Sequence, residues 1–281
     1  MHVVRHSDPD AFLAAAAPMA ARGQASASFF AGWAHAMKRK PPRGGERVYL
    51  ATWDGGDARG AAVQRDDGPV VIGASDVDGA VAFACDLARE QPELQGVVGG
   101  PRGCDAFARK WQELTGRAHR LRFRMRQHAL TAVNDVPVAA GMARTADEAD
   151  AEWLIERQIA FIAEVGIPDS PQRVREQLPE RVARGDFRIW DDGGPVAYAG
   201  FSDAAPDFAR IAPVYTLPDR RGRGYATALV AELSRELLAR GKRMLFLTTD
   251  VANPTSNAIY ARIGFRAESD ECHLDFIAPA R

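Results

Sequence analysis

Apolar residues follow two different spacings along the second half of the chain. After residue 224 they recur with a helical period, at Ala226, Leu229, Val230, Leu233 and Leu237. This spacing predicts a helix with one buried face, and Gly241 is expected to end it. Apolar runs of strand length stand on either side, at 209–216 and 244–250. The order strand, loop, helix, strand is therefore expected here.

The same patterns predict further elements in the second half. In order, these are a short strand after Gly141, a helix opened by a capping box at 145–148, a helix after Ser170, strands at 187–190 and 196–201 around a hairpin turn at 191–194, and a last helix from Pro254 with Asn253 as its cap.

The first half repeats this order more faintly. Its predicted elements are a helix after Pro9, strands at 47–53, 61–64 and 70–74 with a turn at 54–57, a helix at 80–89, a strand at 97–98 and a helix through 107–114. We therefore expect two related domains, 1–133 and 142–281, joined by a linker at 134–141 that contains Pro137.

The loop before the long helix is suited to binding a diphosphate. Gly222 and Gly224 have no Cβ atom to keep an anion from the backbone, and they allow φ angles closed to other residues. Free N–H groups and the positive end of the dipole favour phosphate at a helix N-terminus, and nearby arginines add positive charge. The first half has carboxylates at the corresponding stretch, 74–79, which would repel a diphosphate.

Spacing excludes two common phosphate motifs at this loop. A P-loop requires Gly-Lys-Ser/Thr, and a dinucleotide fingerprint requires Gly or Ala where Thr227 stands. What remains is Arg-x-x-Gly-x-Ala, from Arg221 through Gly224 to Ala226. It resembles the signature of the GNAT superfamily of acyl-CoA-dependent N-acyltransferases.

The segment after the next strand strengthens this resemblance. Asn253, Asn257 and Tyr260 share one face of the predicted helix, and the pair Gly264-Phe265 follows it. The second half of the GNAT core has the same features in the same order. The resemblance implies an α/β fold of two GNAT-like domains, each a twisted mixed sheet flanked by helices, with a degenerate N-terminal copy. In the C-terminal domain it implies that the fourth and fifth strands splay apart.

The resemblance also implies a cofactor and its site. Acetyl-CoA is expected as co-substrate, with its pantetheine arm beside the fourth strand, where Pro213 has no N–H to give to a ladder. The implied binding residues are Val214, Tyr215, Thr216, Arg221, Gly222, Arg223, Gly224, Tyr225, Ala226, Thr227, Asn253 and Asn257.

Direct attack by an amine needs an oxyanion donor, an acid for the thiolate and a route for the ammonium proton. The resemblance implies the Val214 N–H as donor and Tyr260 as acid, and a buried ring is the other interpretation of Tyr260. Many GNAT enzymes carry a Glu on the fourth strand, but 208–212 holds no carboxylate. Asp250 is the candidate base, with Asp203 and Asp207 as candidate anchors for a cationic amine. A water relay is equally open, and so is turn capping by each aspartate.

Composition limits the function classes. The 281 residues carry a formal net charge of −1, which argues neither for nucleic acid nor for a membrane partner. The three cysteines show no Cys-x-x-Cys spacing, so neither a disulfide framework nor a metal site is expected. Cytoplasmic localisation fits, and no apolar run has the length of a membrane helix.

Arginines and apolar residues alternate from 120 to 126. A strand there would present one face of arginines, which could bind RNA. The simpler interpretation is that these arginines contact the other domain or solvent. The sequence thus predicts an N-acetyltransferase that acts on a primary amine of a small molecule or peptide. A non-catalytic acyl-CoA sensor and a nucleic-acid-associated protein are the alternatives, and a homodimer is left open.

Overall fold

The computed structural model describes residues 2–20, 48–54, 60–65, 68–73, 77–91, 93–166 and 170–277, together with residues 30, 32, 34, 37 and 38. Its contacts divide the chain into two units. Unit 1 comprises residues 1–128, 248–253 and 267–281, and unit 2 comprises residues 129–247 and 254–266. Each unit is considered by itself. Within the described residues, no helix has the length and apolar character to cross a membrane.

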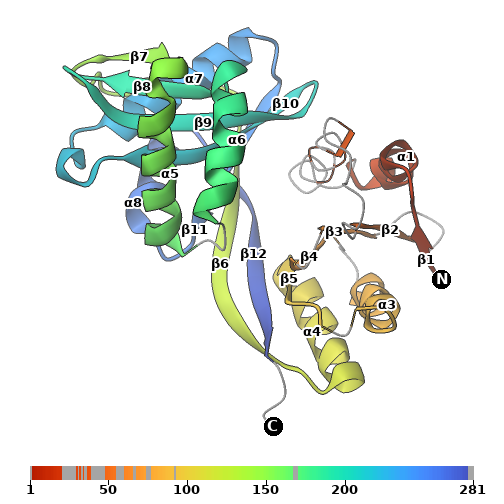
Figure 1. Ribbon diagram of the computed structural model, residues 1–281. Helices are drawn as coiled ribbons and strands as arrows, with labels where there is room; N and C mark the ends of the chain where they lie inside the picture. The colour runs from red at the N-terminus through yellow and green to blue at the C-terminus, as the bar shows by residue number, and fades with distance from the viewer. Residues whose placement is uncertain are drawn as a thin grey trace. The chain divides into compact units, whose positions relative to one another are not determined.

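Unit 1 is built on a mixed sheet (Figure 1). Its strands, in spatial order, are β1 (His2–Arg5), β2 (Val48–Asp54), β3 (Gly60–Arg65), β4 (Val70–Ile72), β5 (Gly96–Gly99), β12 (Arg266–Ile277) and β6 (Ala118–Leu130). β4 and β5 run parallel, whereas β1 to β4 are antiparallel neighbours and β12 runs antiparallel to β5.

Alternation along β2 explains why helices cover both faces of this sheet. Tyr49 and Trp53 lie in one core with α3 (Val77–Ala88) and α4 (Pro101–Thr115). Leu50 points to the other face, where it packs with Phe12 of α1 (Pro9–Ala20). Successive side chains of a strand point to opposite faces, so a strand of apolar residues feeds two cores.

Unit 2 is likewise built on strands in mixed order (Figure 1). Its strands, in spatial order, are β11 (Met244–Asp250), β10 (Phe208–Thr216), β9 (Pro195–Ala205), β8 (Phe187–Asp191) and β7 (Met142–Thr145). β10 and β11 run parallel, and the other neighbours are antiparallel. The helices are α5 (Ala151–Val165), α6 (Pro171–Ala183), α7 (Tyr225–Ala239) and α8 (Pro254–Ile263).

Two cores again lie on the two faces of this sheet. Ile189 of β8 packs with Leu154 of α5 and Leu178 of α6, whereas the next residue, Trp190, packs with Leu233 of α7 in the other core. The expected fold class, mixed sheets flanked by helices, is therefore confirmed. Residues 55–57 of the turn expected at 54–57, and residues 74–76 of the acidic stretch, lie outside the described residues.

The last strand, β12, is covered by none of the predicted elements. Cys272 pairs opposite Gly99 of β5. Phe276 is buried in the core of unit 1, where its ring stacks on Trp111 with centroids 5.3 Å apart. Residues 267–281 therefore belong to unit 1, although the expected boundary placed them in the second domain, 142–281.

The expected linker at 134–141 is a packed part of unit 2. The Asn134 N–H donates to the Ile263 carbonyl oxygen at 2.8 Å, and its side-chain amide donates to the Arg262 carbonyl at 3.1 Å. Val136 and Ala139 pack against the core that contains α7. This segment therefore caps the C-terminal end of α8. Such tertiary contacts cannot be predicted from the Pro and Asn residues that suggested a linker.

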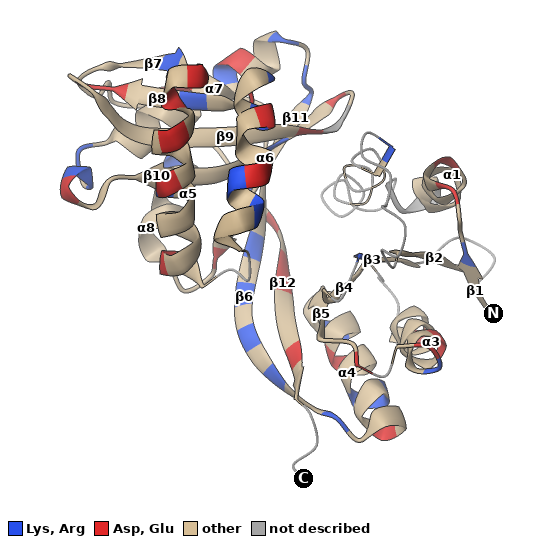
Figure 2. Ribbon diagram, viewed as in Figure 1, with Lys and Arg blue, Asp and Glu red and all other residues tan. Residues whose placement is uncertain are grey.

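The arginines of β6 lie next to aspartates of β12 (Figure 2). Arg126 makes two hydrogen bonds to the Asp270 carboxylate, at 2.7 and 3.0 Å. Arg120 and Arg122 are within 3.5 and 3.7 Å of Asp275. The arginine stripe thus meets carboxylates of a neighbouring strand in its own unit, an arrangement that the alternation in 120–126 alone does not reveal.

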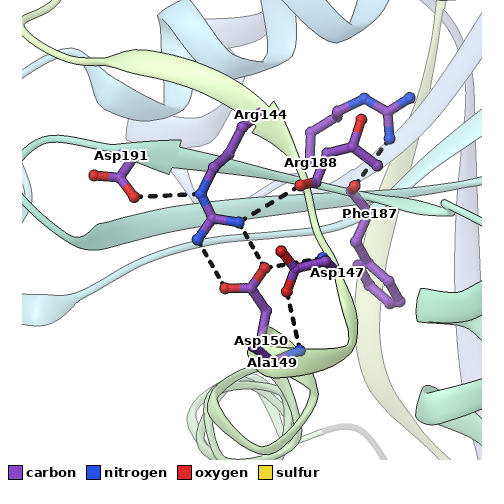
Figure 3. Close-up of polar contacts among 8 residues, drawn as sticks. Arg144, Asp147, Ala149, Asp150, Phe187, Arg188 and Asp191 are labelled. Carbon is purple, nitrogen blue, oxygen red and sulfur yellow. Dashed lines mark hydrogen bonds and ion pairs between the residues drawn. The ribbon is translucent and has the colours of Figure 1, made fainter.

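The start of α5 differs in detail from the sequence prediction (Figure 3). The capping box lies at 147–150, two residues after the predicted 145–148: Asp147 accepts from the Ala149 N–H, and Asp150 accepts from the Asp147 N–H. Asp150 also binds the Arg144 guanidinium through two hydrogen bonds of 2.6 and 2.7 Å. Asp150 thus takes part both in the capping box, at the start of a short 3-10 helix (Glu148–Asp150) that leads into α5, and in the ion pair with the arginine of β7.

Candidate active site

The two parallel strands of unit 2 separate part of the way along their length. Cα pairing between β10 and β11 covers only Phe208–Met244 to Arg210–Phe246. β10 nevertheless continues to Thr216, where it still pairs with β9, and β11 continues to Asp250. The expected splay of these strands is confirmed. Beyond Arg210, no described strand of unit 2 pairs with this side of β10, so its backbone can pair with an extended ligand.

A bulge interrupts β10 just after the strands separate. The register with β9 shifts between Ile211 and Val214, around Pro213, as expected for a proline that cannot donate to the ladder. Gly200 on β9 makes this possible, because a Cβ atom there would lie 2.9 Å from the Ala212 carbonyl oxygen and 3.0 Å from Pro213 Cδ. After the bulge, Val214 pairs opposite Ala199 and is half-buried.

The loop after β10 has the open backbone that an anion site needs. Gly222 and Gly224 adopt φ angles of 78° and 85°, in the left-handed region that favours glycine. A Cβ atom at Gly222 would meet no heavy atom within 4 Å, so the space beside this backbone is open.

The first turn of α7 follows directly. Gly224 is its N-cap and has no side chain to offer, and the first intrahelical hydrogen bond runs from the Ala228 N–H to the Gly224 carbonyl. The N–H groups of Tyr225, Ala226 and Thr227 are thus among the donors that a helix leaves without intrahelical partners. Residues 222–227 therefore fit a diphosphate group.

Arg221 links this loop to two other elements. Its Nε donates to the Thr216 carbonyl at 3.2 Å, and Nη2 donates to the Glu164 carboxylate at the end of α5 at 2.7 Å. The guanidinium also lies over the Tyr215 ring, 5.5 Å from its centroid. The hydrogen bond with Glu164 raises the pKa of Arg221. Glu164 carries no motif, and only the fold brings it to this loop.

Tyr225 anchors the start of α7 from the opposite side. Its ring is buried, and its hydroxyl donates a hydrogen bond to Asp192 in the turn between β8 and β9. This hydrogen bond, together with burial, raises the pKa of Tyr225. Arg223 also contacts the hydroxyl, and this contact lowers the pKa of Tyr225. Asp192, like Glu164, supports the loop without a sequence signal beyond its place in a predicted turn.

Tyr260 lies on α8 with its ring half-buried. The ring packs edge-on against Phe265, with centroids 5.9 Å apart at 73°. Burial raises the pKa of Tyr260 to about 12, so the phenol keeps its proton. Within the described residues its hydroxyl makes no hydrogen bond, which leaves it available to a ligand. Asn257, one turn earlier on α8, is also half-buried.

The three aspartates considered as base or anchors have other contacts. Asp250 accepts from the Ala252 N–H at 2.8 Å, and its carbonyl accepts from the Asn253 N–H, so it caps the turn after β11. Asp203 pairs with Lys242 at 2.8 Å and Asp207 lies 3.8 Å from Arg243. Asp203 is opposite Ala209, about 17 Å along β10 from Val214 at the usual rise of a strand.

Unit 2 contains most of the residues predicted to bind the cofactor or to act in catalysis. These are Val214, Tyr215, Thr216, the loop 221–227, Asn257 and Tyr260. Asp250 and Asn253 belong to the short segment that is grouped with unit 1. Among the described residues, no cluster of three or more His, Cys, Asp or Glu could hold a metal ion.

Comparison with known proteins shows which proteins this chain resembles. Residues 152–265 match the Acetyltransferase (GNAT) family. The chain is 32% identical over 151 residues to a mycothiol acetyltransferase of Clavibacter michiganensis, a match that covers 49% of this chain and 47% of the relative. The chain thus spans about half the length of this curated relative.

Two solved structures share the fold over nearly the whole chain. A GCN5-related N-acetyltransferase from Sphaerobacter thermophilus superimposes with a TM-score of 0.65 at 18% identity, covering 99% of this chain and 97% of that one. A tandem GNAT protein from the clavulanic acid biosynthesis pathway gives a TM-score of 0.59 at 17% identity, covering 100% and 99%. Residues 152–265 are therefore similar to the GNAT family, and the chain as a whole has the fold of these two structures.

Proposed function

We propose that this protein is an acetyl-CoA-dependent N-acetyltransferase whose reaction takes place in unit 2. The observation that carries the proposal is the open, glycine-lined N-terminus of α7, placed directly after a strand that has lost its parallel neighbour. A diphosphate at the helix and an extended arm along β10 together match the two ends of a coenzyme A thioester. The family match over 152–265 supports the same conclusion.

The residues of unit 2 divide the work as follows. Acetyl-CoA, when bound, supplies the activated acetyl group. The N–H groups of residues 222–227 hold its diphosphate, and the backbone of Val214 and Thr216 aligns its arm. The Val214 N–H stabilises the oxyanion that develops when a neutral amine attacks the acyl carbon. Tyr260 donates its proton to the departing thiolate, because its phenol is protonated and its hydroxyl has no hydrogen bond within the described residues.

The amine must also lose a proton during this reaction. β10 offers no carboxylate before the bulge, and an oxygen of Asp250 already accepts from Ala252. These observations favour ordered water as the route for the ammonium proton, with Asp250 as the alternative base. As to the acceptor, the name of the bacterial relative favours a primary amine of a small molecule over a protein terminus.

Two measurements on the full chain test this proposal. Calorimetric titration with coenzyme A should give saturable one-site binding, and dephospho-coenzyme A, which keeps the diphosphate, should bind through the same loop. Release of free thiol from acetyl-CoA should then depend on one member of an amine panel. If neither coenzyme A nor dephospho-coenzyme A binds, the proposed binding site is wrong.

A second function, acyl-CoA sensing without turnover, is favoured by one observation: no carboxylate stands on β10 where a base is expected. The two functions differ in one outcome. A sensor binds coenzyme A but releases no thiol with any amine, and Tyr260→Phe then changes nothing in the assay. An enzyme loses thiol release in that variant while binding is retained.

A further inference from the structure

Two cysteines far apart in the sequence meet in the core of unit 1. Cys104 lies in the first turn of α4, and Cys272 lies on β12, 168 residues later. Both are buried, with 0% and 5% of their surface exposed. The Cys104 thiol donates to the carbonyl oxygen of Cys272 at an Sγ···O distance of 3.6 Å. The pairing of Cys272 with Gly99, the residue that ends β5 just before α4, fixes this approach.

The two sulfur atoms are chemically unequal. The close approach of the two side chains, together with burial, raises the pKa of Cys104, whereas the same approach lowers the pKa of Cys272. The nearby Arg124 lowers the pKa of Cys272 further. A sulfur that loses its proton more readily, next to one that keeps it, is the arrangement in which one cysteine attacks an oxidant and the other resolves the product.

The third cysteine has no such partner. Cys85 lies on α3 in the same unit, is half-buried, and contacts no other cysteine among the described residues. It therefore serves as an internal reference for any reaction of the other two. All three are free thiols in the structure.

We propose that Cys104 and Cys272 form an intramolecular disulfide site, with a peroxide as the oxidant. The Cys272 thiolate attacks one peroxide oxygen and the O–O bond breaks, which gives a sulfenic acid at Cys272 and releases water after protonation. The Cys104 sulfur then attacks the sulfenic sulfur, its proton leaves with the departing hydroxide as a second water, and the S–S bond forms. Two thiols and one hydrogen peroxide thus become one disulfide and two waters.

The bond would fasten the last strand to the unit that it completes. β12 is held there by pairing with β5 and by apolar contacts such as those of Phe276. A covalent link between α4 and β12 restricts the unfolded chain across a long loop, so oxidation should stabilise unit 1. The inference does not depend on acetyl transfer, since all of its residues lie in unit 1.

Trypsin separates the three cysteines, which makes the test direct. Cys104 falls in peptide 103–109, Cys272 in 267–281 and Cys85 in 66–89. The native full-length protein is treated with hydrogen peroxide, and catalase then removes the excess peroxide. The protein is denatured in the presence of N-ethylmaleimide, which alkylates every remaining thiol, and is digested without reductant. We expect mass spectrometry to find 103–109 joined to 267–281, whereas 66–89 carries maleimide. Dithiothreitol before alkylation should abolish the cross-link.

Variants supply the matched controls. Cys85→Ser should leave the cross-link intact, and Cys104→Ser should remove it while circular dichroism confirms the fold. The oxidised wild type should melt at a higher temperature than the reduced protein, and Cys104→Ser should lose this difference. The inference is overturned if native Cys104 and Cys272 both stay alkylatable after peroxide treatment, or if either pairs with Cys85 instead.

Discussion

At the scale of single residues, the surroundings of two tyrosines determine what each can do. The hydroxyl of Tyr225 donates to Asp192, and this contact is the first cause of its raised pKa. The hydroxyl of Tyr260 has no partner among the described residues, and burial alone raises its pKa. Tyr225 is therefore a structural anchor, whereas Tyr260 keeps both its proton and a free donor for a leaving thiolate.

This contrast predicts different outcomes for the same substitution at the two positions. Tyr260→Phe keeps the ring against Phe265 but removes the proton donor, so kcat should fall about 10²- to 10⁴-fold with little change in the KM for acetyl-CoA. Tyr225→Phe should lower thermal stability and leave kcat nearly unchanged. Steady-state thiol release measures both, and equal losses of kcat would count against Tyr260 as the acid.

The pH dependence of the same step follows from the sign of the shift. The protonated phenol is the active form, and a pKa raised to about 12 keeps it protonated throughout the range of an ordinary assay. We expect kcat to show no loss on the alkaline side until the pH approaches that value. A decline in kcat centred near pH 8 would instead point to another group as the acid.

Asp150 gives a prediction about stability. Its two hydrogen bonds to Arg144 lower its pKa below the ordinary 3.8, so the ionised form stabilises the folded state. Asp150→Asn should lower the free energy of unfolding at pH 7 by about 2 kcal/mol. The difference from wild type should be complete above the ordinary pKa and shrink as the pH falls through the lowered one. Urea unfolding at pH 7 and pH 3 measures this, and an unchanged difference would contradict it.

At the scale of elements, three backbone features coincide at the junction between β10 and α7: the end of pairing with β11, a bulge and two glycines. A bulge around Pro213 follows the point where pairing with β11 ends, and two glycines of positive φ then open the backbone before the helix. Arg221 and Tyr225 fix the loop from either side through Glu164 and Asp192. A loop held in this way is organised before a ligand arrives, which lowers the entropic cost of binding.

Glycines at the two ends of α7 allow a matched test of the loop. Gly222 and Gly241 both have positive φ, and a Cβ at either would meet no heavy atom within 4 Å. Alanine at each should therefore cost a similar 1–2 kcal/mol or so of stability. Only Gly222→Ala should weaken coenzyme A binding in calorimetry, by about tenfold or more, because a methyl group then occupies the place of the anion. Equal affinities for the two variants would remove the loop from the site.

The contact between α5 and the loop can be tested in the same way. Glu164→Gln weakens the contact that positions Arg221, so the KM for acetyl-CoA should rise about two- to fivefold while kcat is kept. Glu152 lies on the same helix as Glu164 and makes a comparably exposed ion pair with Arg175 of α6. Glu152→Gln is therefore the control and should leave KM unchanged. A fall in kcat with unchanged KM would show that Glu164 acts in chemistry rather than in positioning.

At the scale of the whole molecule, the C-terminal segment completes the N-terminal unit. The chain returns from α8 into β12, whose inward residues join the core that holds α4. Phe276 stacks on both Phe107 and Trp111 there. The two units are therefore connected by more than one passage of the chain.

Single core substitutions should reveal this organisation by hydrogen exchange. Phe276→Ala is expected to lower the stability of unit 1 by about 3–5 kcal/mol, with faster exchange in 96–115 and little change in β8 and β9. Phe201→Ala, in the core of unit 2, should show the reverse pattern. If Phe276→Ala instead accelerates exchange in β8 and β9, the assignment of β12 to unit 1 is wrong.

The sequence determined those features that depend on neighbours along the chain. Periodicity located β10, α7, β11 and α8, because burial of one face imposes its spacing on a helix or strand. Gly222 and Gly224 marked the anion loop, since few other residues adopt their backbone angles. Pro213 marked the break in β10 because it has no N–H to donate.

Only the tertiary structure decided which distant groups meet. The pairing of Glu164 with Arg221, of Asp192 with Tyr225 and of Cys104 with Cys272 depends on chain paths that no local spacing records. The capping box lies at 147–150 instead of 145–148, and its Asp150 also binds Arg144 of β7. Local sequence fixes backbone preferences and buried faces, whereas side-chain partnerships are set by the packing of whole elements.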